Sequence, residues 1–456
     1  MEDPDTQEYG IDGKLEPSHD QEMSEERTQT WWQTVASIWN SMAGSQALVL
    51  PWVMEQAGLI PGVILLVVSG TISNYTANIV LDLSRYQEDF STMASRFLGR
   101  KGQVFSLLVS VLFLGAVCAG AFNIMNGLMF KIIGAFYEWN TGNELNFDSI
   151  SLDEFTTSWM AIILGVFMLA LTMIKKPSIF LKILSSGAIF GIALYCYVII
   201  YGIYEISNNH SRYTTSHHPN ADQVRIVLFG KGWLKVAPVM VLSFLLQHII
   251  KDIVKKAKHP EHNKRDISLG YISVGLSFGI VCFLGYIGFT AKFESLEQNI
   301  LNNFAYTNVA AFLIRSAIFF QIVTVYPVLV YFLRSQFYNS FWGREYPSFA
   351  HVFALNVIVV ASNTIITCFD PKGVGTIMRY NGAIFGSIIM LVIPLSCKIV
   401  HDYQLAQTDA ASLESINQTK KPIPSRRTLY TKIAFNGTLL FVGMVLLYAQ
   451  FFYTPQ

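Results

Sequence analysis

The chain has 456 residues, of which 52% are hydrophobic and 14% are charged, and its formal net charge is +1. Soluble domains carry about 25% charged residues, so this composition indicates an integral membrane protein. A net charge near zero provides no field that would attract nucleic acid, and we expect no nucleic-acid partner. The five cysteines stand singly in apolar segments, which argues against a disulfide framework or a zinc site.

The start of the chain differs in composition from the rest. Residues 1–30 are polar, and their acidic residues outnumber the basic ones. Such a segment cannot bury enough apolar surface to fold, so we expect a disordered acidic cytosolic tail. No signal peptide is recognisable, which predicts that the first helix is the signal anchor. Residues 31–453 are then expected to form one transmembrane transporter domain.

Long apolar segments follow one another through the remainder of the chain. A transmembrane helix needs roughly 17–25 mostly apolar residues, and about eleven segments meet that requirement. The sequence therefore predicts an all-α integral membrane protein. The predicted spans are 33–54, 59–83, 103–137, 156–174, 180–204, 233–252, 267–290, 309–335, 350–368, 375–401 and 430–453.

Lys and Arg concentrate in alternate loops between these spans. Basic residues mark cytosolic loops, so the pattern places the N-terminus in the cytosol and the C-terminus in a lumen or outside the cell. The loop 402–429 is then cytosolic and the loop 205–232 is extracytosolic. The second loop contains the sequence Asn209-His210-Ser211. This sequence is an acceptor for N-glycosylation, and its side of the membrane is the one on which glycosylation occurs.

The first span carries small and polar residues at its centre, including Asn40, Ser41, Gly44 and Ser45. Such residues can pack closely against a neighbouring helix, or hydrogen-bond to carbonyls of their own helix. A third interpretation is that the helix is unwound there and presents its backbone to a ligand, because irregular backbone at membrane depth requires a cavity or surrounding protein. Many secondary transporters build their site from two such interrupted helices.

A second interrupted span lies five helices later, in segment 233–252. Pro238 stands in its first third, Ser243 lies at its midpoint, and Gln247 and His248 follow. The two interruptions occupy corresponding positions of two five-helix halves, with one helix left over. The pattern favours a 5+5 inverted-repeat transporter in which Ser243, Gln247 and His248 face the substrate. A membrane protein whose polar residues only pack helices together is the alternative.

The eighth span adds a candidate cation ligand. Thr324 lies near its middle, before Pro327, and its hydroxyl could join carbonyls freed in the first helix to hold Na⁺. The alternative is that Thr324 hydrogen-bonds to a carbonyl of its own kinked helix. No Asp or Glu lies at mid-membrane depth in any predicted span. A cationic substrate side chain would therefore find no buried carboxylate, and a proton relay through one is unsupported.

Other polar residues within the spans are predicted to support the bundle. Arg315 lies near one membrane surface, where it could extend toward water or pair with another group. The buried asparagines are expected to hydrogen-bond between helices. They are Asn74, Asn78, Asn123, Asn126, Asn363 and Asn381.

Several stretches carry a resemblance to a known family. WNSMAGSQALVLPWVMEQAG resembles the first helix of the amino acid/auxin permease family, which has the fold of the bacterial leucine transporter. The stretches HNKRDISLGYISV, LEQNILNNF and RYNGAIFGS are similar to a sodium-coupled branch of that family. The similar member of that branch transports arginine in lysosomes and reports arginine to a growth-control kinase pathway. The resemblance covers residues 31–400.

The resemblance implies roles for individual residues. Asn40 and Thr324 stand where sodium-coupled relatives hold Na⁺, and no other cofactor is expected. The unwound part of the first helix is where the family binds the amino and carboxylate groups of its substrate. Its residues here are Ser41, Met42, Ala43, Gly44 and Ser45.

The expected function is secondary transport of arginine, neutral amino acids or both, by alternating access, in a lysosomal or late endosomal membrane. The alternative is an amino acid receptor that signals nutrient status. For that role the resemblance implies a lysosomal GTPase–scaffold complex as partner, which the similar member engages through an N-terminal arm longer than the segment before Trp31. An enzyme is not expected, because the sequence has no nucleophile elbow, metal-ligand motif or paired carboxylates at membrane depth.

Overall fold

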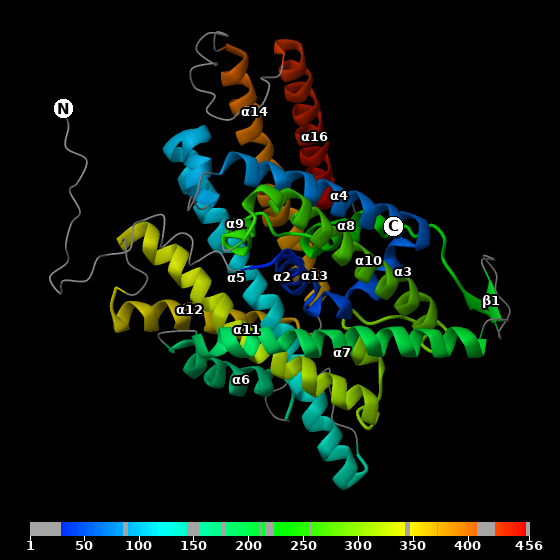
Figure 1. Cartoon of the computed structure of the whole chain (residues 1–456). Coiled ribbons are helices and arrows are strands. Elements are labelled where there is room, and N and C mark those ends of the chain that lie inside the picture. Colours follow the sequence, from blue (N-terminus) through cyan, green and yellow to red (C-terminus); the bar gives the residue numbers. More distant parts are fainter. Residues whose placement is uncertain are drawn as a thin grey trace.

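The computed structural model describes residues 29–84, 90–143, 155–174, 178–209, 212–214, 223–255, 257–342, 347–371, 373–407 and 425–452. Nearly all of these residues are helical (Figure 1). Within the described ranges, eight helices are long and apolar enough to cross a membrane, and two shorter apolar helices accompany them. Residues 1–28 of the predicted tail lie outside the described part.

The helices follow the predicted spans. The first half contains α2 (Trp31–Ala43), the 3₁₀ segment η1 (Ser45–Leu48), α3 (Leu50–Ala57), α4 (Leu59–Leu83), α5 (Phe90–Thr141), α6 (Thr157–Thr172) and α7 (Ser178–Asn209). The second half contains α8 (Trp233–Ser243), α9 (Ile250–Val254), η3 (Pro260–His262), α10 (Asn263–Thr290), η4 (Ile300–Asn303), α11 (Val309–Trp342), α12 (Phe349–Phe369), α13 (Val374–Asn381) and α14 (Ile393–Gln407). Helix α16 (Arg426–Phe452) is the additional one, and β1 (Tyr213–Thr214) pairs in parallel with β2 (Val224–Arg225).

Both predicted helix interruptions are confirmed. Helix α2 begins after Thr30, whose backbone N–H donates to Oε1 of Gln33 at 2.9 Å, and it ends at Ala43. Gly44 then takes φ −1° and ψ −127°, values outside the helical region, before η1 and α3 continue the span. In the second half, α8 ends at Ser243 and regular helix resumes only with α9.

Several helices extend beyond their predicted limits. Helix α5 starts at Phe90 rather than near 103 and bends at Gly99, where φ is 70°, a conformation that favours glycine. Helix α7 continues through Asn209, so the extracytosolic connection predicted from residue 205 starts later. Helix α14 continues to Gln407, which likewise shortens the connection predicted over 402–429.

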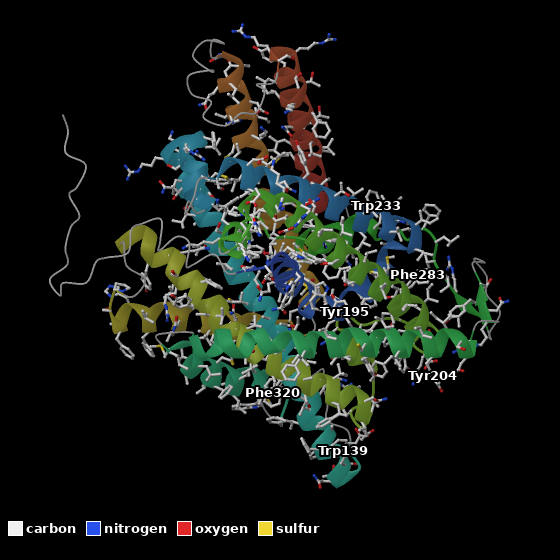
Figure 2. All side chains as sticks on the ribbon, in the orientation of Figure 1. Trp139, Tyr195, Tyr204, Trp233, Phe283 and Phe320 are labelled. Atoms are coloured by element: carbon white, nitrogen blue, oxygen red, sulfur yellow. The ribbon has the colours of Figure 1, made fainter. Side chains whose placement is uncertain are left out.

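The broken helices lie inside the bundle. Helix α10 packs against α2, α3, α4 and α7, and α5 packs along α11. Helices α14 and α16 pack together and project from the bundle in Figure 1. Figure 2 shows Tyr204 of α7 and Phe320 of α11 on the outside, where the two side chains are 60% and 61% exposed. Large apolar side chains on the outer faces of such helices suit contact with lipid.

The tenth span is one continuous helix, Val374–Gln407, with irregular turns that the sequence did not predict. Two π-helical segments, η5 (Gly382–Gly386) and η6 (Ile388–Val392), separate α13 from α14. A Cβ atom at Gly382 would lie 2.0 Å from the carbonyl oxygen of Pro238. Glycine therefore permits this span to approach the broken helix α8. π-Helical turns of this kind often occur at functional sites.

Arg315 does not extend toward water but pairs with backbone carbonyl groups, which is the second of its two predicted arrangements. Its side chain is fully buried near the start of α11. Nη1 donates to the carbonyl oxygens of Ala305 and Tyr306 at 3.2 and 3.5 Å. Nη2 donates to those of Leu301 and Phe304 at 2.8 and 2.7 Å. The guanidinium group thus holds the connection between α10 and α11 in place.

Candidate functional site

A cavity of about 310 Å³ lies where the two interrupted helices meet. Its walls come from the α2–η1 break, α5, the α8–α9 break, α11 and α13. Most of the lining side chains are apolar, including Phe113, Ile124, Leu245, Val325 and Met378. Among the described lining residues there is no Asp, Glu, Lys or Arg. The polar residues are Asn40, Ser41, Gln46, His248, Gln321 and Asn381.

Hydrogen bonds from neighbouring helices hold the first break. The hydroxyl of Tyr195 in α7 donates to the carbonyl oxygen of Ala43 at 3.2 Å, and Figure 2 shows Tyr195 at the centre of the bundle. The ring of Tyr195 also packs against Trp39, whose Nε1 donates to Oγ of Ser277 in α10 at 2.9 Å. A carbonyl freed by the break is therefore satisfied without closing the helix.

Gln247 holds the second break against α4. Its Oε1 accepts the backbone N–H of Leu246 at 3.0 Å, and its Nε2 lies 2.9 Å from both Oγ of Ser73 and Oγ1 of Thr76. The hydroxyl of Ser73 in turn donates to the carbonyl oxygen of Phe244 at 2.5 Å. Gln247 is buried and is not part of the cavity wall. It supports the unwound backbone rather than facing a ligand.

A side-chain contact joins the two breaks to each other. Oγ of Ser243 lies 3.1 Å from Oε1 of Gln46 and 2.8 Å from the carbonyl oxygen of Val239, so its single proton is shared between these acceptors. Ser243 ends α8, and Gln46 lies in η1. The hydrogen bond therefore fixes the position of one interrupted helix relative to the other.

The predicted site residues separate into two groups. Five line the cavity, namely Asn40, Ser41, Met42, Gly44 and His248. Four lie outside its wall, namely Ala43, Ser243, Gln247 and Thr324. The side chain of Ser45 is outside the described part. The hydroxyl of Thr324 donates to the carbonyl oxygen of Gln321 in its own helix at 2.7 Å, which is the alternative that the sequence left open.

Three polar residues of the cavity wall were not among the predicted site residues. Gln46 directly follows the predicted binding segment, and Gln321 lies one turn before Thr324. Their positions next to predicted site residues would have been enough to include both in the site. Asn381 was predicted to hydrogen-bond between helices, but its Oδ1 has no hydrogen-bond partner within the described part of the chain. It lies immediately before the first π-helical segment, which no sequence pattern indicated.

The other asparagines predicted to hydrogen-bond between helices mostly do so. Nδ2 of Asn123 donates to the carbonyl oxygen of Asp370, and Nδ2 of Asn126 donates to that of Thr157. Asn363 donates to the hydroxyl of Tyr326. Oδ1 of Asn74 accepts a hydrogen bond from Oγ of Ser268 in α10. Asn78 differs, since it bonds to Asn74 within its own helix.

The end of the cavity toward α3 is closed by a loop. Oε1 of Glu55 accepts the backbone N–H of Leu296 at 3.0 Å, and Oε1 of Gln298 accepts that of Gly375 at 2.7 Å. A Cβ atom at Gly375 would lie 3.0 Å from the ring of Trp52. Helix α3, the α10–α11 connection and α13 thus meet at this end. Because Ser41 is exposed, the cavity is reached from the α2 end.

Asn209, the predicted glycosylation residue, lies at the end of α7. Its Nδ2 donates to the backbone carbonyl and to Oε2 of Glu205 at 2.9 and 3.2 Å. Its Oδ1 accepts Nη1 of Arg212 at 2.9 Å. His210 and Ser211, which complete the acceptor sequence, lie outside the described residues.

A larger recess of about 740 Å³ lies on the outer face between α4 and α10. Its walls include Val67 and Leu276, which are 59% and 64% exposed. We assign the candidate site to the smaller inner cavity, because polar groups from both helix breaks converge only there among the described residues.

Comparisons with known proteins agree with this geometry. Residues 27–423 match the family described as transmembrane amino acid transporter protein. Neutral amino acid transporter 9 of Danio rerio is 26% identical over 92% of this chain and 80% of its own length. A Caenorhabditis elegans protein described as a sodium-coupled neutral amino acid transporter 9 homolog is also 26% identical, over 79% of this chain and 66% of its own length. Vacuolar amino acid transporter 2 of Saccharomyces cerevisiae is 21% identical over 78% of this chain and 73% of its own length.

Solved structures support the same fold. The inward-facing conformation of Mhp1 matches 92% of this chain and 91% of its own, with a TM-score of 0.56 at 12% identity. MhsT in complex with L-phenylalanine matches 92% of this chain and 97% of its own, with a TM-score of 0.55 at 10% identity. The architecture is the leucine-transporter type, with a 5+5 repeat and broken first and sixth helices. The chain belongs to the transmembrane amino acid transporter family.

Proposed function

We propose that this amino acid transporter carries neutral amino acids and binds them in the cavity between the two helix breaks. The observation that supports this most directly is that the described wall has apolar side chains and no carboxylate. An arginine side chain would bring a positive charge into that wall without a partner, at a large desolvation cost. A neutral side chain carries no such cost. Of the substrates expected from the sequence, arginine is therefore the one that this cavity disfavours. Relatives described as neutral amino acid transporters support the proposal.

The backbone of the first break provides groups for the part that all amino acids share. The C-terminal end of α2 carries a partial negative charge that favours the substrate ammonium group. Amide groups of the unwound segment near Gly44 can donate to the substrate carboxylate. The substrate side chain is then directed toward α5, α11 and α13, which form the remainder of the wall.

Na⁺ is the proposed coupling ion, with Asn40 and Thr324 as its candidate side-chain ligands. Asn40 lines the cavity, and the oxygen of Thr324 keeps free lone pairs while its proton is donated to Gln321. The name of the Caenorhabditis elegans relative includes sodium coupling. If the proposal holds, Asn40→Ala removes the dependence of uptake on a Na⁺ gradient. Equal uptake by the unaltered protein with and without a Na⁺ gradient would contradict the proposal.

We further propose an endolysosomal membrane, with the N-terminus in the cytosol and the C-terminus in the lumen. The alternation of basic loops supports this orientation, and the yeast relative is described as vacuolar. Asn209 is the proposed glycosylation residue. Glycosidase treatment should then increase the electrophoretic mobility of the protein, and Asn209→Gln should abolish that shift. Protease protection of the C-terminus in intact vesicles tests the orientation.

A receptor that reports amino acid binding is the second candidate. The observation that favours it is a contact between the segment before α2 and the chain after α9. The backbone N–H of Lys258 donates to the carbonyl of Gln29 at 2.8 Å. A movement of the α8–α9 break could therefore be transmitted through this hydrogen bond to the segment before α2. Co-purification of a GTPase–scaffold complex that changes when amino acid is added would support the receptor, and constant or absent co-purification would count against it.

Ligand-induced stabilisation of the purified protein tests the proposed substrate class. A ligand that binds only the folded protein raises the unfolding temperature, and at a given concentration a tighter ligand raises it more. We expect leucine, methionine or glutamine to raise it and arginine to have little effect at the same concentration. Ser41→Trp places a large ring in the cavity and should abolish the response. A response to arginine alone, or an unchanged response in Ser41→Trp, would contradict the proposal.

A further inference from the structure

The outer recess of about 740 Å³ between α4 and α10 extends along both helices. Its wall reaches from Leu66 to Asn74 on α4 and from Tyr271 to Leu284 on α10. At a rise of about 1.5 Å per residue, the wall on α10 is about 20 Å long. Both helices are long and apolar enough to cross a membrane, in which the hydrocarbon of one leaflet is about 15 Å thick. The length of the recess therefore matches the depth of roughly one leaflet.

Glycines leave this space open. A Cβ atom at Gly275 would meet no described atom within 4 Å, and one at Gly279 would meet only Leu66, at 3.5 Å. Ile272 and Leu276 stand beside these glycines and are exposed. Gly275 is therefore not required for a close contact between helices, and a larger side chain at this position would occupy the recess.

The floor of the recess belongs to the second helix break. Phe244 directly follows α8, and a Cβ atom at Gly70 would lie 3.2 Å from its ring. The carbonyl oxygen of Phe244 accepts the hydroxyl of Ser73 at 2.5 Å and that of Tyr271 at 3.4 Å. Both Phe244 and Tyr271 line the recess. An occupant would therefore pack against the unwound segment and against a side chain that holds it.

The wall suits an apolar occupant. None of its described residues is Asp, Glu, Lys or Arg, and its polar members are Thr71, Asn74 and Tyr271. The last two already have partners, because Asn74 accepts a hydrogen bond from Ser268 and Tyr271 donates to Phe244. The remainder of the wall is apolar side chains and glycine. On the outer face of membrane-spanning helices the surrounding medium is lipid hydrocarbon.

The size of the recess distinguishes lipid chains from a helix of a second copy. A cavity of about 150 Å³ holds the six carbons of benzene, so about 740 Å³ takes on the order of thirty carbon atoms. That is the hydrocarbon of one diacyl phospholipid. A helix about 10 Å in diameter would need about 1,600 Å³ over the same length of about 20 Å. Acyl chains therefore fit within the recess, whereas a helix does not.

We infer that the recess between α4 and α10 binds the acyl chains of a membrane phospholipid, and that the bound chains support the unwound segment after α8. Chains in this position supply the van der Waals contacts that the wall lacks where Gly275 and Gly279 have no side chain. The inference concerns the outer face of the bundle, so it is independent of which amino acid the inner cavity binds.

Photo-crosslinking in liposomes tests the occupant. The probe is phosphatidylcholine with a photoactivatable group on one acyl chain, and mass spectrometry of the purified full chain locates the crosslinked residues. We expect crosslinks to concentrate on the wall of the recess, at Val67, Ile272 and Leu276. They should exceed several-fold those at Val166 of α6 and Phe441 of α16, which are at least as exposed but lie outside the recess.

Gly275→Phe places a ring in the recess and should remove most of these crosslinks. Val166→Phe adds a ring to an exposed face elsewhere and is the matched control, which should keep them. Hydrogen exchange of the backbone amides 244–249 reports on the break. Adding phosphatidylcholine to delipidated protein should slow this exchange in the unaltered protein and in Val166→Phe. In Gly275→Phe the ring takes the place of the chains, so added lipid should have no effect.

Four results would overturn the inference. Crosslinks that are spread evenly over the exposed helix faces, and that Gly275→Phe does not change, would show ordinary bilayer contact only. Displacement of the probe by a sterol but not by unlabelled phosphatidylcholine would assign the recess to a sterol. Crosslinks between two copies through residues of the recess would assign it to a second copy of the chain. Exchange at 244–249 that does not respond to lipid in the unaltered protein would exclude support of the break.

Discussion

Buried polar side chains have two different roles in this bundle, and adjacent residues can differ in role. Gln247 holds the unwound backbone against Ser73 and Thr76, whereas His248, the next residue, lines the cavity. Both residues were predicted to lie in the site, because the position of the second helix break was predicted correctly. The sequence could not assign their directions, since an unwound segment lacks the fixed 3.6-residue period from which a face is deduced. The prediction that Asn381 hydrogen-bonds between helices also failed, and the π-helical segment that begins directly after it had no sequence signal.

Removing the amide of Gln247 tests its supporting role. Gln247→Ala leaves the N–H of Leu246 and the hydroxyls of α4 without that partner, so we expect the free energy of unfolding to fall by about 1–3 kcal/mol. The unfolding temperature in detergent measures the change. Asn140→Ala, an exposed position in α5, is the control and should shift it little. Equal unfolding temperatures for the two variants would refute the supporting role.

Arg315 offers a second prediction at this scale. Arg315→Met keeps much of the side-chain volume but removes all four hydrogen bonds to the 301–306 segment, at a cost of about 3 kcal/mol. Hydrogen exchange of the backbone amides in 301–306 should speed up, because their local structure opens more often. Arg315→Lys should have an intermediate effect. Exchange rates that match the unaltered protein would show that this loop does not depend on Arg315.

At the scale of elements, the breaks in the first and sixth spans were predictable, whereas helix ends and the π-helical turns of the tenth span were not. Small and polar residues at mid-span, with Pro238 in the partner span, indicated both breaks. The ends of α7 and α14 extend past their apolar segments because a helix continues into water wherever its residues and packing permit. The π-helical tenth span had no sequence signal, because its backbone depends on the close approach between Gly382 and Pro238.

The junction between α3 and α4 gives an element-scale prediction. Gly58 has φ 78°, and a Cβ atom there would lie 2.3 Å from the backbone nitrogen of Gly230. Gly58→Ala should displace the Gly230 N–H from the carbonyl of Ala57, which it contacts at 2.8 Å. Gly142 has φ 73°, and a Cβ atom there would meet no described atom within 4 Å. Gly142→Ala therefore measures the cost of the backbone conformation alone, about 1 kcal/mol. A lower unfolding temperature is expected for Gly58→Ala, and equal values would exclude the clash.

At the scale of the whole molecule, the two broken helices meet at one cavity that is closed toward α3 and reached from the α2 end. We propose that transport proceeds by alternating access, which requires the opposite arrangement as well, so that the contacts at the closed end open during transport. Those contacts are the hydrogen bonds of Glu55 to Leu296 and of Gln298 to Gly375. Both join the α10–α11 connection to helices that line or border the cavity.

Weakening the closed end should shift the protein toward the opposite conformation. Gln298→Leu removes the acceptor for the N–H of Gly375. A cysteine introduced by Met378→Cys, on the cavity wall, should then react several-fold faster with a membrane-impermeant thiol reagent added on the α3 side. The exposed Cys196 is replaced first to remove background labelling. Unchanged labelling would mean that Gln298 does not contribute to closure.

We propose that this family member moves neutral amino acids through the cavity between the helix breaks. The decisive experiment is uptake of labelled leucine, glutamine and arginine by the purified protein in liposomes, with and without a Na⁺ gradient. We expect saturable uptake of the neutral amino acids, little uptake of arginine, and no uptake by Ser41→Trp. Preferred uptake of arginine, or binding of neutral amino acids without measurable flux, would contradict it.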